Sequence, residues 1–253
     1  MRFKLVVSAA AVCFALVKPD IAGATIWSVG DLTSYTQASW GDDLSGTPQG
    51  PAAATLVAHY DDVYASTLGI LTVGSASGFT MRFSDASSVL AYMPAIGPFA
   101  PLNGNVLNPI TNVSGGLGGE VTGLSLNVNF SDAGFLPGNS GLRFGDLLLT
   151  DFKLLPQLNG VSVRAFLGDM NTLLSGGSTI ITLAELGSLI GDLNASFSVG
   201  QPSDFAQLHL VAPDQTSATP LPGALPLFAS GLGALGLLGW RRKRIQKTAC
   251  KSV

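Results

Sequence analysis

Two uncharged apolar runs, one near each end of the chain, separate a central body from two ends that do not belong to its core. The first run covers residues 5–17 and follows two basic residues, and the second covers residues 224–240 and precedes four. As helices they would rise about 20 Å and about 26 Å, against about 30 Å for the hydrocarbon core of a bilayer. The first run is therefore too short to span a membrane, and the second reaches the lower limit.

The N-terminal end has the three parts of a secretion signal. Arg2 and Lys4 are the basic part, the apolar run follows, and Ala22 and Ala24 are the small residues that a signal peptidase requires. We expect residues 1–24 to be a signal peptide that is cleaved before Thr25.

The C-terminal end has the parts of a membrane-held tail. A spacer rich in Pro, Ser and Thr covers residues 213–219, and the tail covers residues 220–244. Within the tail we expect a transmembrane helix at 224–240, which the membrane-stopping residues follow: Arg241, Arg242, Lys243 and Arg244. Because basic clusters stay in the cytoplasm, the body is expected outside the inner membrane.

The tail resembles a PEP-CTERM sorting signal, closest to the variant usually written VPLPA. Pro220, Leu221 and Pro222 match the centre of that variant, whereas Thr219 replaces its Val and Gly223 its Ala. The resemblance implies recognition by exosortase, a membrane protease-transpeptidase of Gram-negative bacteria that make exopolysaccharide. It also implies that the apolar run is a temporary anchor, removed as the body moves from the periplasm to the cell surface or the medium.

The body also resembles a recurrent type of PEP-CTERM protein that has no assigned activity, so no catalytic residue is implied by the likeness. The matching stretches are residues 144–147, 158–161, 171–174 and 193–197.

The charge of the body excludes one class of partner. Residues 25–218 hold 15 acidic against four basic side chains, a net charge of −11. Nucleic-acid binding needs stripes of Lys and Arg, so no nucleic-acid partner is expected. Cys13 and Cys250 lie in the two ends, so the body has no disulfide or thiolate site.

The periodicity of the body, residues 25–212, predicts a β-rich α+β fold with two parts. Over 25–155, short apolar runs alternate with turn residues, and 124–130 alternates strictly between apolar and polar, as in a half-exposed antiparallel strand. We expect an antiparallel β-sandwich-like arrangement there, with Gly115–Gly119 as a turn or flexible loop. Strands are also expected at residues 68–73, 79–83 and 147–152.

The second part, residues 156–212, predicts two amphipathic helices packed on the sheet. Apolar residues recur every three or four positions from Val163 to Leu174, before two glycines. Thr182 and Glu185 have the spacing of a capping box, and an apolar stripe follows them to Leu193.

No coherent catalytic group emerges from the sequence. His59 and His209 are the only histidines, and neither has partners at the spacing of a metal or nucleophile site. The doublets Asp42-Asp43 and Asp61-Asp62 would point apart on a strand. We therefore expect no enzyme and no cofactor, with calcium at the Asp-rich loops as an alternative.

An exopolysaccharide-binding or polysaccharide-active module is the second hypothesis, because β-rich modules often present aromatic faces to sugars. The candidate residues are Trp27, Tyr35, Trp40, Tyr60, Tyr64 and Tyr92. The first hypothesis is a non-catalytic protein of the cell surface or extracellular matrix.

Overall fold

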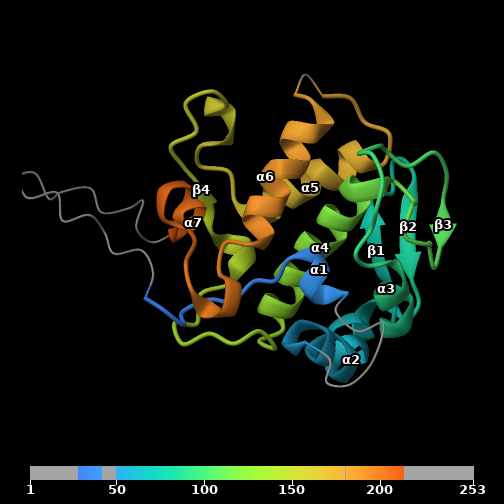
Figure 1. Cartoon of the computed structure of the whole chain (residues 1–253), viewed down its shortest axis with the longest axis horizontal. Coiled ribbons are helices and arrows are strands. Elements are labelled where there is room, and N and C mark those ends of the chain that lie inside the picture. Colours follow the sequence, from blue (N-terminus) through green and yellow to red (C-terminus); the bar gives the residue numbers. More distant parts are fainter. Residues whose placement is uncertain (1–27, 42–49, 180, 214–253) are drawn as a thin grey trace, which may run out of the picture.

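The computed structural model describes residues 28–41, 50–179 and 181–213. These residues form a mainly helical body in which seven α-helices accompany five short strands (Figure 1). The helices are α1 (Gln37–Trp40), α2 (Pro51–Tyr64), α3 (Ala86–Tyr92), α4 (Gly115–Asp132), α5 (Val163–Leu174), α6 (Leu183–Asn194) and α7 (Asp204–His209). The strands are β1 (Leu71–Gly74), β2 (Thr80–Phe83), β3 (Val106–Leu107), β4 (Leu148–Leu149) and β5 (Leu210–Val211). Short 3-10 turns lie at Ala65–Thr67, Phe144–Asp146, Pro156–Leu158 and Ser198–Gly200.

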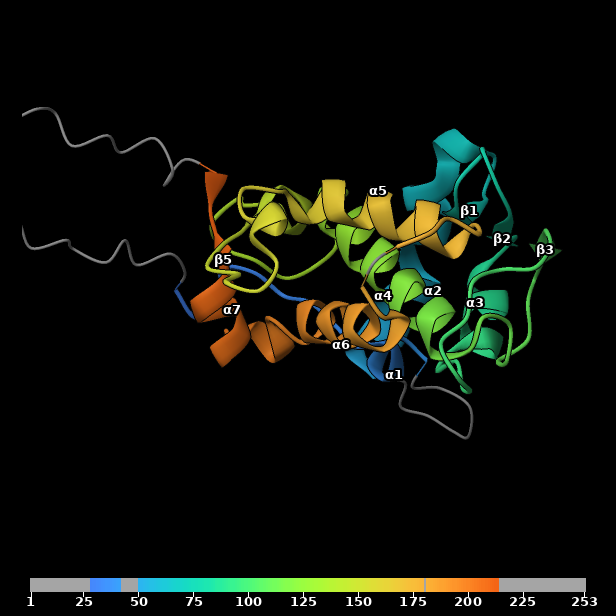
Figure 2. The ribbon, with the colours of Figure 1, turned by 90° about the horizontal axis from the view of Figure 1, so that it is seen from above.

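Helix α4 is the centre of the fold. Of its 18 residues, 14 are buried, and it packs against α1, α5, α6 and the Phe144–Asp146 turn (Figures 1 and 2). A helix that is buried on every side cannot have a polar face, because that face would have no water to contact. Helices α1, α5 and α6 cover α4, and a single hydrophobic core of the described residues extends from Leu32 to Ala212.

The two sheets are small and lie at opposite ends of the body (Figure 2). In the first, β2 pairs antiparallel with β1, with Leu71 opposite Phe83, and parallel with β3. In the second, β4 pairs antiparallel with β5, with Leu148 opposite Val211. The second sheet joins the middle of the chain to the last described residues.

The prediction of a β-sandwich is wrong. The strands expected at 79–83 and 68–73 correspond to β2 and, in part, to β1, but β4 is only two residues long. The segment 124–130 lies inside α4. Its alternation does not reflect a sheet face, because two of its three polar residues, Ser125 and Asn127, are buried in the core and hydrogen-bonded there. Helices α1 to α4 all lie within residues 25–155, where strands were expected.

The glycine-rich stretch Gly115–Gly119 is also not a loop. It is the start of α4, and all five residues are buried. Side chains there would meet neighbouring elements: a Cβ on Gly118 would lie 2.2 Å from the hydroxyl of Tyr92. Small residues are thus required by close packing.

The two helices expected after residue 156 are confirmed. Helix α5 begins after Ser162, whose hydroxyl accepts a hydrogen bond from the backbone N–H of Ala165 at 3.1 Å. Helix α6 begins with the predicted capping box, in which Thr182 and Glu185 hydrogen-bond each other's backbone N–H groups. Both helices turn their apolar stripe toward α4 and leave the opposite face in water.

Within the described ranges, no helix is both long and apolar enough to cross a membrane. The predicted signal peptide, sorting motif, transmembrane helix and basic cluster lie outside those ranges.

Candidate functional site

A buried polar network joins α1, α4 and α6 around Asn127, which is fully buried. Its Oδ1 accepts hydrogen bonds from the backbone N–H of Tyr35 at 2.8 Å and from Trp40 Nε1 at 3.3 Å. Its Nδ2 donates to the Tyr35 carbonyl at 2.8 Å and to Asn194 Oδ1 at 2.9 Å. All four hydrogen-bonding positions of this amide are used, so it fixes the packing of three elements and offers nothing to a ligand.

Glu120 extends this network and is the described acidic residue with a raised pKa. Its Oε1 accepts from Gln37 Nε2 and its Oε2 from Asn194 Nδ2, both at 2.8 Å. Burial raises the pKa of Glu120, although the two hydrogen bonds partly oppose that effect. Raised carboxyl pKa values are common at catalytic sites. Here both oxygens are already held by amides, which favours a structural role.

The raised pKa of Glu120 gives a testable pH dependence. Between 4.5, the ordinary value, and the higher folded value, the folded state holds a proton that the unfolded state has lost. The free energy of unfolding should therefore fall as the pH rises through this window. In Glu120→Gln that titration is absent, so the stability difference from wild type should change across the window and become constant above it. Urea midpoints measured over a pH series would show this.

Glu185→Gln is the matched control, because hydrogen bonds from Thr182 lower the pKa of Glu185. A group with a lowered pKa contributes stability that is lost as the pH falls, so this variant should show the opposite trend. A stability difference for Glu120→Gln that is the same at every pH would contradict the assignment.

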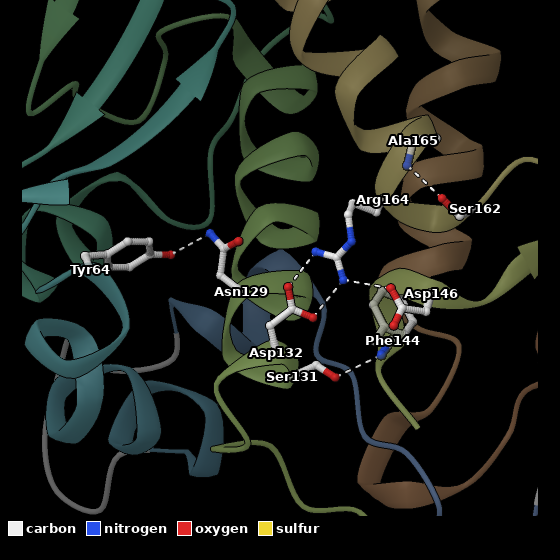
Figure 3. Close-up of polar contacts among 9 residues, drawn as sticks. All are labelled: Tyr64, Asn129, Ser131, Asp132, Phe144, Asp146, Ser162, Arg164 and Ala165. Atoms are coloured by element: carbon white, nitrogen blue, oxygen red, sulfur yellow. Dashed lines mark hydrogen bonds and ion pairs between the residues drawn. The ribbon is translucent and has the colours of Figure 1, made fainter. Parts of the chain in front are cut away.

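The main ionic cluster of the described body lies where the C-terminal end of α4 meets the start of α5 (Figure 3). Arg164 pairs with both oxygens of Asp132, with Nη2 to Oδ1 at 2.8 Å, and with Asp146 Oδ1 at 3.0 Å. The hydrogen bonds to Asp132 keep the pKa of Arg164 above its ordinary value. A Cβ on Gly145 would lie 2.7 Å from Nη2, so glycine leaves room for the guanidinium.

The position of each charge explains why this cluster is paired. Asp132 is the last residue of α4, and Arg164 is the second residue of α5. The helix dipole disfavours a carboxylate at a C-terminus and a cation at an N-terminus. Pairing the two offsets both effects and joins α4 to α5. The side chains are partly exposed, so we expect a contribution of about 1 kcal/mol or less.

A hollow beside this cluster is too small for a typical ligand. It is lined by Asp31, Asp132, Arg143 and the loop of residues 134–142. Its volume of about 240 Å³ is below the range of about 300–1,000 Å³ typical of small-molecule sites. The ion pairs of Arg164 therefore serve to link α4, α5 and the Phe144–Asp146 turn.

The two histidines lie far apart in the fold and are held differently. His59, on α2, stacks on the ring of Phe135 with centroids 3.9 Å apart, and its Nδ1 lies 3.2 Å from Asp62. His209 ends α7, and its Nδ1 lies 3.0 Å from the Thr150 carbonyl. The structure does not bring them together, so they form no joint catalytic or metal site.

The aromatic residues proposed for sugar stacking are mostly in the core. Those that the structure describes are all buried: Tyr35, Trp40, Tyr60, Tyr64 and Tyr92. Trp27 lies outside the described residues. Buried rings cannot stack on a polysaccharide, so these residues contribute to stability instead.

The structure places one of the two acidic doublets. Asp61 and Asp62 lie on α2 and not on a strand, whereas Asp42 and Asp43 are outside the described residues. Among the residues that the structure describes, no group of three or more His, Cys, Asp or Glu could hold a metal ion. Calcium binding remains an untested expectation.

The sequence did not reveal the importance of Asn127, Asn194, Glu120 or the Arg164 cluster. Arg164 is 32 residues from Asp132 and 18 from Asp146, so no local pattern connects them. Composition was the one signal in the sequence: with four basic side chains among 15 acidic ones in residues 25–218, each basic side chain is expected to form an ion pair.

No protein-family model matches the chain, and no match was found among curated proteins or among solved structures. Its function therefore has to be inferred from its own residues.

Proposed function

We propose that this chain is a non-catalytic protein of the cell surface or extracellular matrix. It would be exported by its signal peptide and held temporarily in the inner membrane by its C-terminal sorting signal. An exosortase-type protease would then process it. The resemblance of the tail to PEP-CTERM signals motivates the proposal, and signal peptidase and exosortase are the implied partners.

The extent of the core is the observation that carries the proposal. The buried apolar cluster of the described residues begins at Leu32 and ends at Ala212. Cleavage after Ala24 and near Pro220 would remove none of its members. A body that keeps every member of its described core through both cleavages can keep its fold after processing.

The state of the polar groups supports a non-catalytic role. A general base needs a free lone pair within reach of its substrate. In the described body, Glu120 accepts from two amides and Arg164 is paired with two carboxylates. His209 Nδ1 contacts a backbone carbonyl, and its ring packs against Phe152 and Phe205. These groups hold the fold together.

Mass spectrometry of the mature ends tests the proposal. The complete chain would be expressed in an exopolysaccharide-forming bacterium that has an exosortase. We expect an N-terminus at Thr25 and a C-terminus close to Pro222, with the body outside the inner membrane. The control replaces Pro220, Leu221 and Pro222 by alanine, and this variant should keep residues 241–253 and stay in the membrane fraction.

A mature N-terminus at Met1, or secreted protein that still carries residues 241–253, would overturn the proposal. Retention of the purified body on the host's exopolysaccharide, with or without calcium, would instead favour a polysaccharide-binding module.

A further inference from the structure

An exposed apolar surface lies at the end of the body where the described chain finishes. We define the β4–β5 surface as Phe152, Lys153, Leu154, Leu155 and Leu208, which with Asp151 and His209 line a shallow hollow of about 550 Å³. Leu154 is 95% exposed and Leu208 is 60% exposed. Exposed large apolar side chains that cluster in this way mark a contact surface more often than isolated ones do.

The loop that presents Leu154 is fixed in shape. Asn159 Oδ1 accepts from the backbone N–H of Phe152 at 2.8 Å, and its Nδ2 donates to the Phe152 carbonyl at 3.3 Å. The Phe152 ring packs against His209, with ring centroids 4.6 Å apart. Asp151 has a φ of 56°, a left-handed conformation that is unfavourable for a non-glycine residue. The fold thus holds Leu154 in water at some cost.

The β4–β5 surface adjoins the point where the described chain leaves the body. Strand β4 runs directly into the loop that carries Leu154, and its partner β5 ends two residues before Pro213. The described chain also begins, in blue, at this end of the body (Figure 2). Ten residues separate Pro213 from the apolar run at 224–240. Fully extended, they would span about 35 Å at most.

We propose that the β4–β5 surface rests on the outer face of the inner membrane while the sorting tail is still attached. This inference depends on the proposed function, because it requires residues 224–240 to be in the bilayer. The short spacer then keeps the surface close to the lipid, at a high effective concentration. Leu154 and Leu208 would enter the interface between headgroups and acyl chains.

The charge of the body indicates what kind of contact this is. With a net charge of −11, residues 25–218 are repelled by anionic lipid, so attraction must come from apolar burial and the tether. Lys153 is the one lysine between residues 28 and 213, and it lies on this surface. A lysine stem can lie along the interface while its amine reaches the headgroups. We therefore expect contact with a zwitterionic bilayer.

Quenching of site-specific probes on the full chain tests this inference. Cys13 and Cys250 would be replaced by serine, and a fluorophore attached at Leu154→Cys or, as the control, at Leu107→Cys. Leu107 is on β3 at the opposite end of the body and is 63% exposed (Figures 1 and 2). Each protein would be placed in phosphatidylcholine vesicles and titrated with iodide, which quenches only from water.

The expected result reverses the order of exposure in the structure. Leu154 is more exposed than Leu107, so without vesicles iodide would quench the probe at 154 more strongly than the probe at 107. On the vesicles we expect it to be quenched several-fold less than the probe at 107. Equal or stronger quenching at 154 would overturn the inference.

Flotation of the same vesicles separates the two ways of failing. A chain that floats with its vesicles but shows no protection at 154 refutes the β4–β5 surface and leaves the anchor intact. A chain that does not float refutes the anchor, and with it the inference.

Discussion

Asn127→Ala is expected to destabilise the body by about 4 kcal/mol, a large part of the 5–15 kcal/mol that holds a typical domain together. The substitution leaves the Tyr35 N–H and carbonyl and Trp40 Nε1 without their hydrogen-bond partner in the core. Each buried polar group left unsatisfied costs about 1–3 kcal/mol. Urea unfolding followed by tryptophan fluorescence would measure the loss, because Trp40 is fully buried.

Asn129→Ala is the matched control for this prediction. Asn129 lies on the same helix two residues later, is partly exposed, and makes one side-chain hydrogen bond, to the hydroxyl of Tyr64 at 3.2 Å (Figure 3). Its loss should cost about 1 kcal/mol. If the two alanine variants unfold at the same urea concentration, the network around Asn127 does not have the importance that its geometry indicates.

The same asparagine shows why the centre of the fold could not be predicted from the sequence. In residues 124–130, polar positions alternate with apolar ones, and a half-exposed strand would give the same pattern. In the structure Ser125 and Asn127 point into the core, where the Ser125 hydroxyl donates to the Val121 carbonyl at 2.8 Å. Periodicity reports which residues avoid water, so it fails where polar residues such as Ser125 and Asn127 are buried together with the apolar ones.

The outer helices were predictable because their signals are local. Helices α5 and α6 each have an apolar stripe that faces α4. Each also has an N-cap residue directly before its first turn, Ser162 for α5 and Thr182 for α6. The Arg164 cluster depends instead on the packing of α4 against α5, which brings distant residues together. The sequence thus predicts α5 and α6, which carry both a stripe and a cap, but misses α2, which meets core and solvent without a side-chain cap, and the contacts that only neighbouring elements define.

Gly115→Ala is expected to cost about 3 kcal/mol or more, because two effects act at once. A Cβ there would lie 2.1 Å from the carbonyl oxygen of Pro98, a backbone atom that cannot rotate away. Overpacking of this kind costs about 1–3 kcal/mol. Gly115 also has a φ of 53°, a left-handed conformation that costs other residues about 1–2 kcal/mol. Thermal or urea unfolding of the purified variant would measure the sum.

Gly168→Ala provides the opposite expectation on the same fold. Gly168 is an exposed interior residue of α5, and a Cβ there would meet nothing within 4 Å. Since glycine inside a helix is less stable than alanine by about 0.5–1 kcal/mol, this variant should gain stability. If both variants were destabilised by a similar amount, the start of α4 would not be packed closely enough to require glycine at 115. A difference in sign would show that glycine at 115 is required by its left-handed conformation and by the approach of α4 to the backbone at Pro98.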